Sequence, residues 1–85
     1  MSVIIYVLES ISNGSRYVGM TENLERRIKE HNAGKMKSTK SFIPWKVVYL
    51  ENVESRIEGR KREKYLKSSA GRRYLQKILA PYLPD

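Results

Sequence analysis

One acidic side chain of this sequence is predicted to face the protein interior. Residues 54–67 have the pattern of a helix, and Gly59, Glu63 and Leu66 fall on one side of it. Ala70 joins this side if the helix stays regular beyond residue 69. A glycine and a leucine are typical of a packing face, because close backbone approach usually compensates for glycine in a helix. A buried carboxylate without a partner is costly, so we expect Glu63 to meet a cation, a metal ion or a hydrogen-bond network.

A second pair of reactive side chains lies on a predicted helix over residues 23–32. Arg27 and His31 are four residues apart, and both fall within about 60° of Leu24, which marks the apolar side of this helix. The neighbouring Arg26 points to the opposite side and is predicted to be solvated. Arg27 is therefore expected at the edge of the core. There it either extends along the sheet or pairs with an acid, the inward glutamate being the obvious candidate.

Two tyrosines are predicted to share one face of a β-hairpin. The Asn-Gly pair at residues 13–14 lies between two apolar runs, which is a strong signal for a two-residue turn. Such a turn places Tyr6 opposite Thr21 and Tyr17 opposite Ser10, so that both rings lie on the same side. Ordinary core packing of the two rings is the alternative interpretation.

The elements that must position these side chains follow in the order β-β-α-β-α-α. The first strand is apolar on both faces, which is typical of a central strand covered on both sides. This order indicates an α+β domain with helices packed on a small sheet, in a single domain over residues 1–85. The predicted strands cover residues 2–9, 16–20 and 45–51, and the predicted helices cover residues 23–32, 54–67 and 70–80.

Composition excludes several classes of protein. The chain has no cysteine, which removes disulfides, thiolate zinc sites and thiol nucleophiles, and a single histidine argues against a structural zinc site. No apolar run approaches the ~20 residues of a membrane helix, and residues 1–8 are too short and uncharged for a secretory signal. We therefore expect a soluble cytoplasmic protein with no membrane-spanning segment.

The basic excess predicts a polyanionic partner. The chain carries 17 Lys and Arg against 9 Asp and Glu, a formal net charge of +8. Nucleic acid is the first candidate, and an anionic membrane surface the second. Residues 34–44 form a basic loop in which Ser38, Thr39 and Ser41 are also predicted to contact phosphates, and residues 60–67 carry a second basic group that includes Arg62. The predicted nucleic-acid-binding residues are Lys35, Lys37, Lys40, Arg60, Lys64 and Lys67.

Together these positions resemble the GIY-YIG nuclease domain, in particular its small stand-alone bacterial members. Ile4-Ile5-Tyr6 stands where the family has its first tripeptide, with Ile4 in place of the leading glycine, and Tyr17-Val18-Gly19 stands for the second. The segment YVGMTENLERRIKEHNAGK resembles the strand and helix that carry the family's catalytic arginine, here Arg27. RKREKYLK resembles the helix with the metal-binding glutamate, here Glu63, although the asparagine that follows it in some members has no counterpart.

The resemblance implies a three-stranded antiparallel sheet flanked by helices, and a metal-dependent catalytic site. One divalent ion, Mg²⁺ or alternatively Mn²⁺, would be held by Glu63 and several waters. Arg27 would contact the scissile phosphate and offset charge in the transition state. Either Tyr6 or Tyr17 would activate or position the attacking water, and His31 would orient water or phosphate.

The function expected from this resemblance is hydrolysis of DNA phosphodiester bonds by an endonuclease of low sequence specificity or structure selectivity, with a role in DNA repair or recombination. Branched or damaged DNA is the expected substrate, with specificity supplied by a protein partner and the chain acting as a monomer or transient homodimer. The alternatives are a non-catalytic nucleic-acid-binding module, or an adaptor that docks through its helices and through residues 80–85.

Overall fold

The sheet is organised around β1 (Val3–Ser10), which lies between β2 (Arg16–Thr21) and β3 (Trp45–Val53). Both neighbours run antiparallel to it. The computed structural model describes residues 2–79 and has the element order β-β-α-β-α-α, with one short 3₁₀ turn, η1 (Lys40–Phe42), before β3. The predicted α+β class, the three-stranded antiparallel sheet and the central position of the first strand are therefore confirmed.

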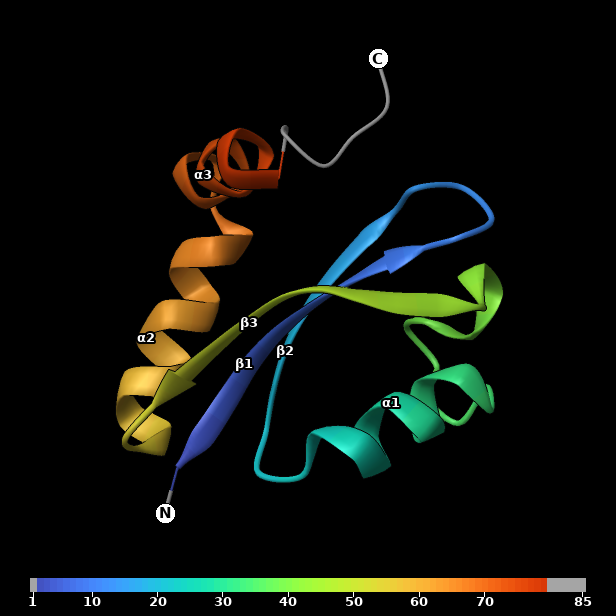
Figure 1. The fold of residues 1–85 in the computed structure, drawn as a ribbon, viewed down its shortest axis with the longest axis horizontal. Helices are drawn as coiled ribbons and strands as arrows, with labels where there is room; N and C mark the ends of the chain where they lie inside the picture. Colours follow the sequence, from blue (N-terminus) through green and yellow to red (C-terminus); the bar gives the residue numbers. More distant parts are fainter. Residues whose placement is uncertain (1, 80–85) are drawn as a thin grey trace.

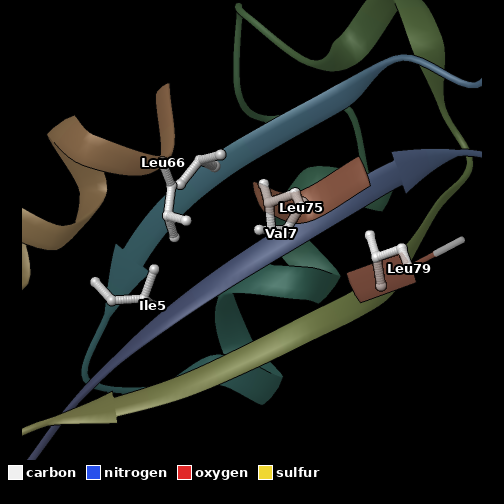
Figure 2. Close-up of a cluster of buried hydrophobic side chains, with 6 residues drawn as sticks. Ile5, Val7, Leu66, Leu75 and Leu79 are labelled. Carbon is white, nitrogen blue, oxygen red and sulfur yellow. The ribbon is translucent and has the colours of Figure 1, made fainter. Parts of the chain in front are cut away.

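Helices cover both sides of the sheet. Figure 1 shows α1 (Leu24–Asn32) on one side and α2 (Arg56–Lys67) with α3 (Ser69–Leu79) on the other. Because alternate residues of a strand face opposite sides, β1 contributes to two separate clusters. Its aliphatic residues pack against α2 and α3 (Figure 2), and the members of that buried cluster are Ile5, Val7, Val18, Leu66, Leu75 and Leu79. The cluster on the α1 side is built from Tyr6, Leu8 and Trp45, with Leu24 and Ile28 packed against it.

The hairpin between β1 and β2 has a longer turn than the sequence predicted. Ser10 N donates to Ser15 O at 2.7 Å, so residues 11–14 form the turn and the predicted two-residue turn is wrong. The physical reason is the Ser10 hydroxyl, which accepts from the backbone amides of Ser12 at 3.2 Å and Asn13 at 3.3 Å and so stabilises a wider loop. Gly14 adopts φ +77° at its end.

The register of this hairpin differs from the predicted one by two residues. Tyr6 pairs with Gly19 instead of Thr21, and Tyr17 pairs with Leu8 instead of Ser10. Because the shift is even, every side chain keeps its predicted face. Tyr6 and Tyr17 therefore still lie on the same side of the sheet, the side that α1 covers.

Side-chain caps set the first residues of α1 and α2. The Asn23 side chain accepts from Arg26 N at 3.1 Å and begins α1, and Gly34 follows that helix with φ +76°. Ser55 accepts from Glu58 N at 3.3 Å and begins α2. These local signals explain why α1 and α2 begin close to their predicted residues.

The chain breaks between α2 and α3, and this break corrects one prediction. The Ser68 hydroxyl donates to Tyr65 O at 2.5 Å and accepts from Gly71 N at 3.2 Å, so it ends α2 and begins α3. The helix therefore does not stay regular, and Ala70 is exposed instead of lying on the packing face. Gly71 is buried in its place, where a Cβ would overlap the Tyr65 backbone. Residue 80, the predicted end of the last helix, and the segment 80–85 lie outside the described residues.

Candidate active site

A buried pair of polar side chains forms the centre of the α1 side. Tyr6 projects from β1 and is 2% exposed, and its hydroxyl lies 2.9 Å from Nε2 of His31, which is 0% exposed on α1. The other ring nitrogen of His31, Nδ1, lies 2.8 Å from Oγ1 of Thr39, which is also fully buried. A continuous polar chain therefore runs from β1 through α1 to the loop that follows it.

Gly19 leaves the space that the Tyr6 ring occupies on the sheet. It lies opposite Tyr6 in the ladder, and a Cβ at position 19 would overlap Cζ and Oη of that ring. The glycine of the Tyr17-Val18-Gly19 tripeptide thus has a steric reason to be there. The sequence offered no direct sign of this contact, because it depends on the exact register of the hairpin.

Tyr17 completes an aromatic cluster around the pair. Its ring centroid lies 5.0 Å from that of His31 and 6.3 Å from that of Tyr6. The ammonium group of Lys67, at the end of α2, lies 5.9 Å from the centre of the Tyr17 ring. The cluster therefore receives side chains from β1, β2, α1 and the last turn of α2, although α2 covers the other face of the sheet.

Arg27 lies at the edge of this site with a spare hydrogen-bond donor. Its side chain is 30% exposed; Nη1 lies 3.7 Å from Glu30 Oε1 and donates to Met36 Sδ, also at 3.7 Å. Its Nε is buried and has no hydrogen-bond partner within residues 2–79. An arginine with a free inward donor is suited to binding an anion such as phosphate. The exposed Arg26 lies on the opposite side of α1, as predicted.

Glu63 has a different partner from the predicted one. Its carboxylate, with its side chain 23% exposed, pairs with Lys67 Nζ at 3.2 Å instead of with Arg27. The i, i+4 spacing within α2 brings Lys67 to the acid. Glu63 lies in a surface hollow together with Arg60, Lys64, Lys67 and Ser68.

The donor set of this hollow fits a hydrated magnesium ion. Within residues 2–79 no group of three or more His, Cys, Asp or Glu side chains is placed to enclose a metal. Mg²⁺ retains most of its waters and needs only one or two carboxylates together with substrate phosphates. The partly exposed carboxylate of Glu63 can supply that single ligand once its ion pair with Lys67, at 3.2 Å, is broken.

The electrostatics of the site keep its central pair neutral. Burial raises the pKa of Tyr6 well above its usual range, nearby Tyr17 and the charge of Glu63 act in the same direction, and Arg27 opposes them. Burial lowers the pKa of His31, Arg27 adds to this shift, and Glu30 opposes it. At neutral pH the phenol therefore keeps its proton and the imidazole is uncharged. The charge of Glu63 thus influences the Tyr6 hydroxyl even though the two residues come from different faces.

The predicted nucleic-acid-binding residues form two exposed groups. Lys35, Lys37 and Lys40 lie in the loop after α1, and Arg60, Lys64 and Lys67 surround the hollow of Glu63. Their role in binding stays a prediction.

Two other residues were assigned to these basic surfaces incorrectly. Thr39 was predicted to contact phosphates, but it is fully buried against His31. Arg62 pairs with Glu51 at 2.8 Å and packs over the rings of Tyr65 and Tyr74, on the side of α2 that faces β3. Both errors arise because the burial of a polar side chain depends on partners distant in the sequence.

Comparison with known proteins identifies the family to which the chain belongs. The family model described as the GIY-YIG catalytic domain matches residues 2–76. The chain therefore belongs to the GIY-YIG family, a family of nuclease type.

Particular relatives within that family are small UPF0213 proteins. The chain is 43% identical over 76 residues to one from Syntrophus aciditrophicus, covering 87% of this chain and 86% of the relative. It is 41% identical over 75 residues to one from Clostridium perfringens, covering 87% and 80%. The solution NMR structure of a UPF0213 protein from Bacillus halodurans matches with a TM-score of 0.57 and 32% identity, over 92% of this chain and 85% of that one. None of the helices described in residues 2–79 has the length and apolarity needed to cross a membrane.

Proposed function

We propose that this protein is a divalent-metal-dependent endonuclease that hydrolyses phosphodiester bonds of DNA. The observation that carries the proposal is the buried Tyr6 hydroxyl, which lies 2.9 Å from a neutral His31. The charge of Arg27, whose Nε has no partner in residues 2–79, also acts on this hydroxyl. This arrangement combines a proton acceptor with an anion-binding group. Membership of the GIY-YIG family supports it.

Tyr6 and His31 act together on the attacking water. A free phenolate is scarce at neutral pH because burial raises the pKa of Tyr6. A free phenolate is not needed, because a neutral imidazole lies within hydrogen-bond distance of the Tyr6 hydroxyl. Tyr6 passes its proton to His31 Nε2 while the Tyr6 oxygen takes a proton from the attacking water. Tyr17 packs against both rings and holds them in place.

Arg27 binds the scissile phosphate. Its guanidinium is anchored on one side by Glu30 and Met36, which leaves Nε to donate to a phosphate oxygen. Negative charge grows on that phosphate in the transition state, and a preorganised cation lowers its energy.

Glu63 is the residue that would hold Mg²⁺, or Mn²⁺ in its place. When bound, such an ion orients the scissile phosphate and stabilises the leaving oxygen. Lys67 neutralises Glu63 in the free protein and becomes available to a neighbouring phosphate when the carboxylate has another cation.

The substrate is DNA bound mainly through its backbone. The exposed basic groups suit phosphate contacts, which position a duplex without reading its sequence. Low sequence specificity or selectivity for branched or damaged structures follows, with repair or recombination as the setting and a protein partner or a second copy supplying further selectivity.

The test compares cleavage of supercoiled plasmid, branched duplex and single-stranded DNA, with Mg²⁺ or with EDTA. Glu63→Ala and Arg27→Ala are assayed beside Glu58→Ala and Arg26→Ala, which remove exposed charges from the same two helices. We expect EDTA and the first two substitutions to abolish cleavage and the two controls to retain it. DNA binding without cleavage of any substrate by the wild type would instead support the alternative, a non-catalytic nucleic-acid-binding module.

A further inference from the structure

The buried hydrogen-bond chain continues from Nδ1 of His31 to Thr39, a loop residue that the proposed reaction does not use directly. We propose that Thr39 is a positioning residue that holds His31 as the Nδ1–H tautomer, so that Nε2 is free to accept the proton of Tyr6. This proposal rests on the proposed function for its catalytic consequence. The tautomer itself is a property of the free protein.

The direction of the hydrogen bonds follows from counting protons. The Thr39 hydroxyl has one proton, and the carbonyl of Met36, 3.4 Å from Oγ1, can only accept. If Thr39 donates to Met36 O, its oxygen accepts from Nδ1–H of His31 at 2.8 Å. Nε2 then has no proton and accepts from the Tyr6 hydroxyl at 2.9 Å. Every proton along the chain has an acceptor.

The opposite direction leaves a buried proton without a partner. If Thr39 donated to Nδ1, Nε2 would carry the ring proton and donate to the Tyr6 oxygen. The phenol proton of Tyr6, on a side chain 2% exposed, would then have no acceptor among the described residues, since His31 is its one hydrogen-bond partner there. An unsatisfied buried donor costs about 1–3 kcal/mol, which favours the first direction.

The position of Thr39 is fixed by bonds from two other elements. Its backbone carbonyl accepts from Trp45 Nε1 at 2.9 Å. Trp45 is in turn held by the side chain of Asn32, which accepts from its backbone amide at 2.6 Å and donates to its carbonyl at 3.1 Å. Asn32 follows His31 directly on α1, so a closed ring of bonds joins the loop, the helix and β3. The hydroxyl of Thr39 is therefore held at a constant place relative to the imidazole.

The hydrogen bond from His31 to Thr39 determines which nitrogen of the imidazole can act as a base. The tautomer of a neutral histidine is set by the hydrogen bond that its other nitrogen makes. Without the Thr39 oxygen, nothing described in the structure retains the proton on Nδ1. The ring can then carry its proton on Nε2, where it cannot accept one from Tyr6.

The experiment uses nitrogen-15 NMR of the imidazole, which is unambiguous because His31 is the one histidine of the chain. The variants are Thr39→Val, the conservative Thr39→Ser, and Thr21→Val as a control. Thr21 is buried like Thr39, but its hydroxyl bonds to the backbone of Asn23 instead of to His31. Cleavage of plasmid DNA with Mg²⁺ is measured on the same samples.

We expect the Nδ1–H tautomer in the wild type, in Thr39→Ser and in Thr21→Val, and a shift toward Nε2–H in Thr39→Val. Cleavage should fall about 10- to 100-fold in Thr39→Val, by analogy with the range typical for residues that orient metal-binding histidines, and recover in Thr39→Ser. An Nε2–H wild type would overturn the proposal, and so would full cleavage by a folded Thr39→Val with a shifted tautomer. If Thr39→Val does not fold, the wild-type and Thr39→Ser spectra still decide the tautomer. A wild type that has the Nδ1–H tautomer but cleaves no DNA would contradict the proposed function and leave the tautomer assignment standing.

Discussion

β1 sends alternate side chains to two faces of the sheet that differ in polarity. On the side of α2 and α3 the buried residues are aliphatic, with Ile5 and Val7 packed against Leu66 (Figure 2). On the side of α1 the same strand contributes Tyr6, which is bonded to His31. The comparison shows that a small domain can separate the two tasks. One face stabilises the fold by apolar burial. The other face buries polar groups, whose presence there is explained by a role in binding or catalysis.

The two faces also differ in how completely their buried groups are satisfied. The fully or nearly buried residues of the aliphatic cluster have no polar side-chain atoms to satisfy. On the α1 face Tyr6, His31 and Thr39 are hydrogen-bonded in a chain, and Arg27 Nε is the buried side-chain atom without a partner among the described residues. A buried donor without a partner is costly, so the unpaired Nε of Arg27 is a reason to expect an anionic ligand at this edge of the site.

The largest expected effect is on the aliphatic face. Leu66→Ala removes a fully buried side chain and should lower the free energy of unfolding by about 2–5 kcal/mol, measured by urea denaturation. Ile57→Ala is the matched control, because Ile57 lies on the same helix but is 70% exposed, and its change should be much smaller. Equal losses in the two variants would contradict the assignment of this face as the stabilising core.

A smaller effect is expected where the two strands meet on the α1 face. Gly19→Ala places a Cβ against the Tyr6 ring and should cost about 1–3 kcal/mol of stability, because the buried ring must move. It should also break the Tyr6–His31 hydrogen bond and reduce cleavage. Gly14→Ala is the control: its φ of +77° is unfavourable for alanine by about 1–2 kcal/mol, but no atom lies within 4 Å of the new Cβ. Cleavage should survive in Gly14→Ala, and its loss there would weaken the steric role given to Gly19.

The acid dependence of stability should also distinguish the two faces. The pKa of His31 is lowered on folding, so below its usual value of about 6.5 the unfolded chain binds a proton that the folded chain does not. Stability should therefore decrease as the pH falls from about 6.5, with a slope of at most about 1.4 kcal/mol per pH unit from this group, and should not depend on it at higher pH. His31→Gln should lose this contribution when unfolding is measured from pH 5 to pH 8. An unchanged slope in His31→Gln would show that other groups cause it.

The smallest expected effect concerns the two sides of α2. Lys64 lines the hollow of Glu63, whereas Lys61 lies with Glu51 and Arg62 on the side facing β3. If DNA binds on the side of the hollow, Lys64→Ala should weaken binding and reduce the slope of log K against log salt by about 0.9, the value for one phosphate contact. Lys61→Ala should leave the slope unchanged. The slopes are measured by fluorescence titration. A reduced slope in Lys61→Ala with an unchanged slope in Lys64→Ala would indicate that DNA binds on the side of α2 that faces β3.

Local periodicity was sufficient to predict part of this site. The alternation of β1 placed Tyr6 on one face and Ile5 on the other, and the i, i+4 spacing placed Arg27 and His31 toward the core edge. Both rules depend only on residues close in sequence. The even parity of a hairpin also preserved the shared face of the tyrosines although the turn length was wrong.

The rest of the site depends on contacts between distant residues. Glu63 pairs with Lys67, one turn further along α2, and not with Arg27, because α1 and α2 lie on opposite sides of the sheet (Figure 1). Thr39 lies in an irregular loop, where no periodicity indicates which side chain turns inward. Its burial follows from the bond of its carbonyl to Trp45, which the sequence does not reveal.

The most direct test of the account is the cleavage rate of Tyr6→Phe under single-turnover conditions with Mg²⁺. Phenylalanine keeps the ring across Gly19 and removes only the hydroxyl that bonds to His31. Tyr65→Phe, a partly exposed tyrosine of α2 outside the site, is the matched control. We predict a rate at least about 100-fold lower for Tyr6→Phe, with DNA binding retained, because proton transfer typically contributes that much or more. Cleavage by Tyr6→Phe at the wild-type rate would contradict the claim that the α1 face of the sheet carries the chemistry through this hydroxyl.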